Sequence, residues 1–147
     1  MKRTSTSRFL RRNRRNAGFT LLELLVVLVI LGLLAAVATP QVLNYLARAR
    51  TQSAGIQINN LASALDLFRL DVGRYPTEEE GLAGLLKAPD GVRNWYGPYV
   101  KKPEMLNDPW GRPYKYRNPG EHRDYDLYTF GADNAEGGQG ENQDITN

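Results

Sequence analysis

The sequence predicts an α+β protein in which a long N-terminal helix precedes a small, turn-rich domain with short β-strands. Three observations lead to this prediction. An apolar run of 20 residues occupies positions 19–38. Apolar residues then recur at steps of three and four, as they do along one face of a helix. From residue 75 onward lie seven of the eight prolines and seven of the eight tyrosines, a composition that indicates turns and short aromatic strands.

Charge and cysteine usage limit the possible functions. The chain has 19 basic and 16 acidic residues, but seven basic and no acidic residues lie in positions 1–18, so residues 19–147 sum to −4. This negative charge disfavours nucleic acid as a partner. The absence of Cys excludes disulfides, thiolate catalysis and Cys-ligated metals. The single His122 excludes His-rich zinc sites. Any bound metal ion would therefore have oxygen ligands.

Residues 19–38 predict a transmembrane helix. The run carries one charge, Glu23, and at about 1.5 Å per residue it is long enough to cross the bilayer core. The basic segment 1–18 places the N-terminus in the cytoplasm by the positive-inside rule. A secreted soluble domain starting at Thr39 is the alternative, because residues 36–38 resemble a signal-peptidase site. The run is longer than a signal peptide requires, however, and Glu23 would then have no role.

Residues 39–72 predict an amphipathic continuation of the same helix. Pro40 is expected to kink the helix without ending it, and Gly73 is expected to end it. The residues of the predicted apolar face are Val42, Leu46, Ala49, Ile58, Leu61, Leu65 and Phe68.

Residues 73–147 predict the small globular domain. Thr77 and Glu80 form a capping-box pattern that opens a short helix through Lys87. Residues 114–117 and 125–130 predict two strands joined by a turn at 118–120. The aromatic residues from Tyr75 onward are interpreted as core, because in a small domain such rings more often fill the core and the charge of −4 disfavours nucleic acid. A platform of exposed rings that stacks on carbohydrate or nucleic acid is the alternative. Residues 131–147 form a glycine-rich, acidic tail that cannot fold by burying apolar surface.

The junction between the basic segment and the apolar run is the most specific motif. It reads Gly-Phe-Thr-Leu-Leu-Glu at residues 18–23. A carboxylate in an apolar helix is costly unless it has a partner or lies near the interface, and snorkelling of Glu23 is the alternative interpretation. The junction resembles that of the type IV pilin superfamily. The resemblance implies a leader of residues 1–18 that prepilin peptidase removes between Gly18 and Phe19, with N-methylation of Phe19.

The resemblance further implies that Glu23 pairs with the Phe19 amine of a neighbouring subunit. It also implies that Pro40 corresponds to the proline that kinks the helix in this superfamily. The globular half is similar to the G-type major pseudopilins of type II secretion systems in residues 73–77, 97–99, 108–111 and 126–133. This similarity implies a pilin-like fold, with the long helix packed on a small antiparallel sheet. It implies a structural subunit and not an enzyme.

The implied subunit is anchored in the bacterial inner membrane, with its C-terminal domain in the periplasm. It forms a homopolymer, the pseudopilus, which helps to export folded proteins across the outer membrane. Minor pseudopilins and the inner-membrane secretion machinery are the other implied partners. Two other interpretations are a type IV pilus subunit or minor pseudopilin, and a membrane-anchored enzyme with an aspartate pair.

The acidic residues near the tail suit Ca²⁺, which takes oxygen ligands on flexible loops. A solvated acidic tail is the alternative interpretation. The resemblance to major pseudopilins implies a C-terminal calcium-binding loop. On that basis Asp126 and Asp133 are the expected side-chain ligands, with main-chain carbonyls supplying most of the remainder. Further candidate ligands are Asp124, Glu141 and Asp144.

Overall fold

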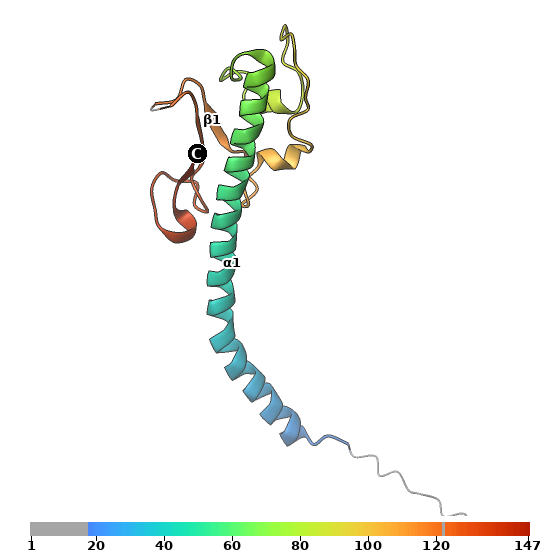
Figure 1. Ribbon diagram of the computed structural model, residues 1–147. Helices are drawn as coiled ribbons and strands as arrows, with labels where there is room; N and C mark the ends of the chain where they lie inside the picture. Colours follow the sequence, from blue (N-terminus) through green and yellow to red (C-terminus); the bar gives the residue numbers. More distant parts are fainter. Residues whose placement is uncertain (1–17, 122) are drawn as a thin grey trace, which may run out of the picture. The chain divides into compact units, whose positions relative to one another are not determined.

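The computed structural model describes residues 18–121 and 123–147 (Figure 1). The predicted leader before Gly18, and His122, lie outside the described residues. The chain divides into two compact units, Met1–Thr39 and Pro40–Asn147, and helix α1 (Leu21–Val72) contributes residues to both. The other elements belong to the second unit: the 3₁₀ helices η1 (Leu82–Leu85), η2 (Pro103–Leu106) and η3 (Gly140–Asn142), and the strands β1 (Lys115–Arg117), β2 (Asp126–Thr129) and β3 (Ile145–Thr146).

Helix α1 begins just inside the predicted apolar run. The Glu23 N–H donates to Thr20 Oγ1 (3.1 Å) and the Leu24 N–H donates to the Thr20 carbonyl (3.1 Å). Thr20 therefore caps the helix and satisfies a backbone donor that has no partner within the first turn. Residues 18–46 are all exposed, and α1 contains a stretch long and apolar enough to cross a membrane. This finding agrees with the predicted transmembrane segment by length and composition.

The helix continues through Pro40, as the sequence predicts. Proline has no N–H, so the carbonyl of Ala36 lacks its usual helical partner. One residue earlier, Thr39 Oγ1 donates to the Ala35 carbonyl (2.7 Å). Helix α1 is thus unbroken at Pro40, while the kink expected there stays a prediction.

Gly73 ends α1, as predicted. Its N–H donates to the Arg69 carbonyl (2.8 Å), and its φ of 86° lies in the left-handed region. This conformation is open to glycine because it has no Cβ, and glycine is the usual residue directly after a helix. The chain then turns back towards the globular domain.

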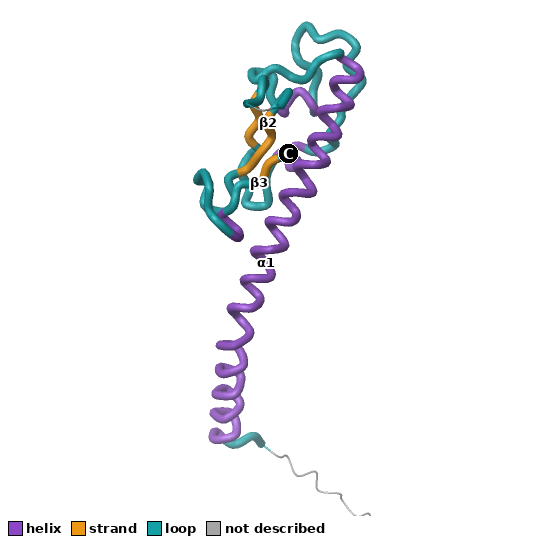
Figure 2. The backbone as a smooth tube through the Cα atoms, turned by 60° about the vertical axis from the view of Figure 1, so that its left-hand side comes forward, coloured by secondary structure: helices purple, strands orange, loops and turns teal. Residues whose placement is uncertain are grey.

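The second half of α1 supplies one side of the core. Ile58, Leu61, Leu65 and Phe68 are each at most 2% exposed, which confirms this part of the predicted apolar face. The earlier part of that face, Val42, Leu46 and Ala49, is exposed in the isolated chain. Strands β2 and β3 lie beside the second half of α1 (Figure 2). The core therefore begins at the level of Ala54, the first buried residue of the helix.

Aromatic side chains fill much of the remaining core. The ring of Tyr99 meets that of Phe68 edge to face, with centroids 5.7 Å apart. Tyr114 and Tyr125 are buried, and burial raises the pKa of both phenols, that of Tyr125 to about 12. The prediction that aromatic residues form the core is confirmed for these residues.

The sheet is antiparallel throughout, in the order β1-β2-β3. The two predicted strands and the turn between them are present as β1 and β2. Strand β3 was not predicted, because its segment carries a single large apolar residue, Ile145. That residue packs against the core, while Thr146 pairs with Tyr128 and the Asn147 N–H donates to the Leu127 carbonyl (3.0 Å). The end of the tail is thus held mainly by backbone hydrogen bonds.

The capping box is present, but the helix after it is shorter than predicted. The Thr77 N–H donates to Glu80 Oε2 (2.7 Å), and the Glu80 N–H donates to Thr77 Oγ1 (3.2 Å). The expected helix through Lys87 is wrong. Residues 78–81 form a turn, and only Leu82–Leu85 is helical, in the 3₁₀ form. The cause is Gly81, whose φ of 53° interrupts a right-handed helix.

Replacing Glu80 with Ala is expected to lower the free energy of unfolding by about 1–2 kcal/mol at neutral pH. The substitution removes the cap and two hydrogen bonds that Arg74 donates to the carboxylate (2.6 and 2.7 Å). The Arg74 hydrogen bonds lower the pKa of Glu80 in the folded state. The stabilisation is therefore complete above the unfolded-state pKa and is lost as the pH falls through the folded-state pKa. Urea unfolding of both proteins at pH 7 and pH 3 measures this loss.

The matched control is Glu79→Ala, because Glu79 is an exposed acid in the same turn. This change is expected to alter the unfolding free energy by less than about 0.5 kcal/mol. An equal effect of the two substitutions, or a Glu80 effect that is the same at both pH values, would contradict the prediction.

Candidate functional site

The first candidate site is the start of α1, where Gly18, Phe19 and Glu23 lie. Gly18 and Phe19 precede the helix and are exposed. Glu23 occupies the first turn, where the positive end of the helix dipole favours a carboxylate. Within residues 18–121 and 123–147, no basic side chain forms an ion pair with Glu23. The Glu23 carboxylate is thus open to a cationic group from another chain.

The second candidate site is the C-terminal loop, residues 131–144. Its two ends meet: the Ala132 N–H donates to the Glu141 carbonyl (2.8 Å). Gly131 is buried at this junction with a φ of 69°, and a Cβ placed on it would lie 2.7 Å from the Glu141 carbonyl oxygen. Only glycine fits this close approach. The loop is therefore closed by backbone contacts that need little apolar surface.

Asp144 is the acidic residue of this loop with the strongest indication of a bound cation. Its Oδ2 accepts a hydrogen bond from the Gly137 N–H (2.9 Å). Its Oδ1 is buried without a hydrogen-bond partner among the described residues. A buried carboxylate oxygen without a partner is costly, and a bound cation would remove that cost. Asp133 lies at the other end of the loop, exposed, with Oδ1 accepting from the Ala135 N–H (3.1 Å).

The other predicted ligands already have partners. Asp126 accepts from the Glu121 N–H (2.9 Å) and lies 4.0 Å from Arg117 Nε. Asp124 pairs with Arg69 (3.2 Å). Glu141 Oε1 accepts from Trp110 Nε1 (2.9 Å) and from Nη1 of the Arg50 guanidinium (3.3 Å). The five predicted ligands are therefore engaged in separate polar contacts and do not form a single cluster.

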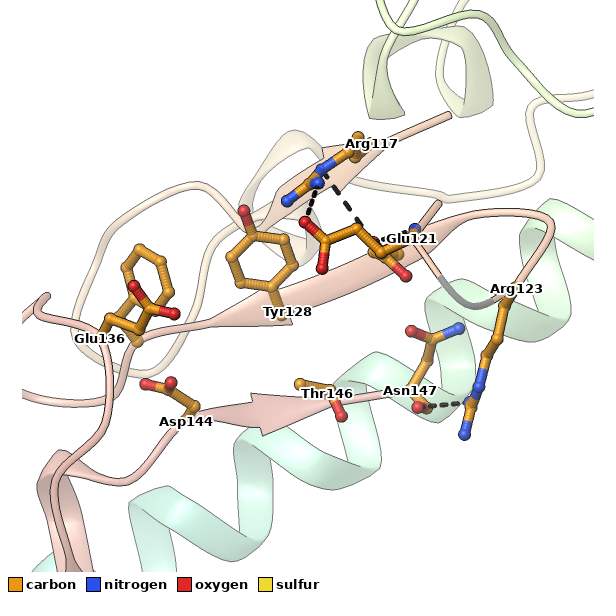
Figure 3. A pocket seen from close by; sticks show the side chains of 10 residues that line it. Arg117, Glu121, Arg123, Tyr128, Glu136, Asp144, Thr146 and Asn147 are labelled. Carbon is orange, nitrogen blue, oxygen red and sulfur yellow. Dashed lines mark hydrogen bonds and ion pairs between the residues drawn. The ribbon is translucent and has the colours of Figure 1, made fainter. Parts of the chain in front are cut away.

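A pocket of about 400 Å³ contains both Asp126 and Asp144 in its lining. Figure 3 shows the carboxylates of Asp144 and Glu136 at one end, and the Arg117–Glu121 pair towards the other. Asp133 is not among its lining residues. Residues 18–121 and 123–147 contain no group of three or more Asp, Glu, His or Cys placed to hold a metal ion. A cation here would therefore need main-chain oxygens or water in addition to carboxylates.

Asp108 and Arg112 are the polar residues near this loop to which sequence reasoning gave no role. Asp108 is buried, and its carboxylate accepts from Thr129 Oγ1 (2.6 Å). Arg112 donates to the carbonyls of Gly131 and Ala132. The signal that could have found Asp108 is the Asp-Pro-Trp-Gly turn at residues 108–111, because Asp favours the first position of a turn.

The match to a family model decides what kind of protein carries these sites. Residues 41–147 match the family described as "Type II secretion system (T2SS), protein G". The chain belongs to the type II secretion system protein G family. Residues 13–39 match the model described as "Prokaryotic N-terminal methylation motif", and this match spans Gly18, Phe19 and Glu23. The motif and the apolar half of α1 together fit a membrane-anchored pseudopilin.

Named relatives agree over nearly the whole chain. The type II secretion system core protein G of Pseudomonas aeruginosa is 44% identical over 138 residues, which cover 91% of this chain and 96% of the relative. That of Vibrio cholerae is 42% identical and covers 94% of this chain and 95% of the relative. The crystal structure of the major pseudopilin from the type 2 secretion system of enterohaemorrhagic Escherichia coli has a TM-score of 0.57 and 35% identity, covering 67% of this chain and 82% of that one. The predicted pseudopilin-like α+β fold is confirmed.

Proposed function

We propose that this protein G family member is the major structural subunit of a type II secretion pseudopilus and polymerises through α1. The observation that carries the proposal is the exposed apolar half of α1, with Glu23 in its first turn, joined to a domain that matches the protein G family. An apolar helix of this length is stable only in lipid or against other helices. The role is structural, and we propose no enzymatic activity.

The membrane topology follows from the charges around the apolar run. The basic leader stays in the cytoplasm, and the globular unit Pro40–Asn147 lies in the periplasm. Prepilin peptidase cuts between Gly18 and Phe19 and methylates the new amine, which keeps its positive charge. Minor pseudopilins and the inner-membrane secretion machinery are the proposed partners in assembly.

The N-terminus and intact mass of the protein from its own membrane test this pathway. A chain that starts at N-methylated Phe19 is the expected result. A chain that starts at Thr39 would instead identify a secreted soluble domain and overturn the proposal.

Deletion of the gene is expected to stop the export of folded proteins across the outer membrane while leaving their export to the periplasm unchanged.

Replacing Glu23 with Ala is expected to reduce fibre yield strongly while leaving cleavage after Gly18 largely intact. The carboxylate is placed to neutralise the Phe19 amine of a neighbouring subunit, and an unpaired charge in an apolar fibre core costs about 3 kcal/mol. Sheared-fibre yield and the ratio of processed to unprocessed chain are measured together. Glu79→Ala, an exposed acid far along the chain, is the control. Normal fibre yield from Glu23→Ala would remove this pairing from the mechanism.

We propose that the C-terminal loop binds Ca²⁺. The unpartnered, buried Asp144 Oδ1 fits such an ion, and the donor set of carboxylates and backbone carbonyls is the one that Ca²⁺ prefers. Asp144 and Asp133, at the two ends of the loop, would hold the ion through their side chains, and main-chain oxygens would complete the shell. Asp126, in the same pocket as Asp144, is the alternative side-chain ligand. The ion would neutralise the carboxylate of Asp144 and thereby stabilise the closed loop.

A further inference from the structure

A tight turn at residues 108–112 contacts the C-terminal loop. The Gly111 N–H donates to the Asp108 carbonyl (2.9 Å), which closes the turn, and the Asp108 N–H donates to the Arg112 carbonyl (2.6 Å). The Asp108 carboxylate is buried and accepts from the N–H groups of Trp110 (3.0 Å) and Arg112 (2.9 Å). With the Thr129 hydroxyl as a further donor, the carboxylate ties the turn to β2.

Arg112 connects this buried carboxylate to the first residues of the loop. Its guanidinium donates to the Ala132 carbonyl (3.2 Å) and to the Gly131 carbonyl. Its Nε lies 3.7 Å from Asp108 Oδ2 and is itself buried, with no hydrogen-bond partner in the part of the chain that the structure describes. The planar fork of a guanidinium can hold two carbonyls and face a carboxylate at once, which a lysine ammonium cannot do.

Trp110 connects the same turn to the far end of the loop. Its Nε1 donates to Glu141 Oε1 (2.9 Å). The Glu141 carbonyl in turn accepts from the Ala132 N–H (2.8 Å). The five-residue turn therefore contacts both ends of the loop, at the point where the loop closes on itself.

We propose that Asp108 and Arg112 are a positioning pair that holds the C-terminal loop in its closed, cation-binding form before any ion arrives. This inference rests on the proposed calcium site. A glycine-rich loop loses much conformational entropy on closing, so contacts that close it in advance raise its affinity for an ion. Neither residue is placed as a ligand, and both act through the carbonyls and backbone of the loop.

The first test is Arg112→Lys in the full chain in detergent. Ca²⁺ affinity is measured by titration calorimetry, and hydrogen exchange is measured without calcium. We expect about tenfold weaker Ca²⁺ binding, as for other residues that orient metal ligands. We also expect faster exchange confined to residues 131–144, with no change in residues 54–68 of α1. Arg74→Lys is the matched control, because the Arg74 guanidinium also donates to a carboxylate and to a main-chain carbonyl, but its partners Glu80 and Tyr75 lie outside the loop.

Trp110→Phe is the second variant, and it removes the hydrogen bond that the indole Nε1 donates to Glu141. It is expected to speed exchange in residues 139–144 even if Arg112→Lys fails to fold. Unchanged exchange in the loop of the folded variants, or equally faster exchange in the loop and in residues 54–68, would overturn the positioning role. If the wild-type chain binds no Ca²⁺, the calcium proposal fails, and the calcium-free exchange data alone decide whether the pair positions the loop.

Discussion

Replacing Asp144 with Asn is expected to weaken Ca²⁺ binding by at least about tenfold, because the affinity of oxygen sites depends strongly on ligand charge. The variant is also expected to lose the protection from proteolysis that calcium confers on residues 131–147. In the wild-type chain a chelator should produce the same loosening and lower the yield of polymer. Without the ion, the charge of the Asp144 carboxylate is not neutralised, and ordering of the loop costs about 1–2 kcal/mol per residue.

Asp126→Asn is the informative comparison. Asp126 already accepts a hydrogen bond from a backbone N–H and faces Arg117, whereas Asp144 Oδ1 has no hydrogen-bond partner among residues 18–121 and 123–147. A much larger effect at Asp144 is therefore expected. The opposite order would make Asp126 the ligand, as the sequence analysis predicted. A wild-type chain whose protease resistance and polymer yield do not respond to a chelator would count against calcium altogether.

Replacing Phe68 with Ala is expected to destabilise the globular unit by about 3–5 kcal/mol. Phe68 of α1 is 0% exposed, belongs to the hydrophobic core, and packs against the ring of Tyr99. Since small domains are stable by only about 5–15 kcal/mol, this loss should leave a measurable unfolded fraction near 37 °C. Near-UV circular dichroism during urea unfolding of the full chain in detergent follows the loss of aromatic packing.

Leu67→Ala provides the control for Phe68→Ala. Leu67 is the preceding residue of the same helix, but it is 53% exposed, so the expected change is below about 0.5 kcal/mol. Similar destabilisation by the two substitutions would show that the effect arises in the helix and not in the core.

Elements with a strong local signal were predictable. The steps of three and four residues identified the buried residues Ile58, Leu61, Leu65 and Phe68, and Gly73 marked the helix end. The pairing of Thr77 with Glu80 was correct in its hydrogen bonds. The helix after it was wrong because Gly81 adopts a positive φ, and a glycine in the sequence does not disclose which backbone region it occupies.

The features that were missed depend on contacts between distant segments. Strand β3 has one large apolar residue, so its pairing with β2 left no periodic pattern to find. The role of Asp108 depends on Thr129, and that of Arg112 on Gly131, neither of which is near in sequence. For the same reason, sequence alone could not separate Asp144, which has an unpartnered oxygen, from Asp126, which is paired.

The contact between Trp110 and Glu141 also allows the state of the loop to be followed by tryptophan fluorescence. The chain has only two tryptophans, Trp95 and Trp110. The Trp95 indole N–H donates a hydrogen bond to the Gly84 carbonyl (2.9 Å), away from the loop. Replacing Trp95 with Phe would leave a single emitter at the junction where the loop closes. Its emission would then follow opening and closing in unlabelled protein, in membranes as well as in detergent, while fibres grow.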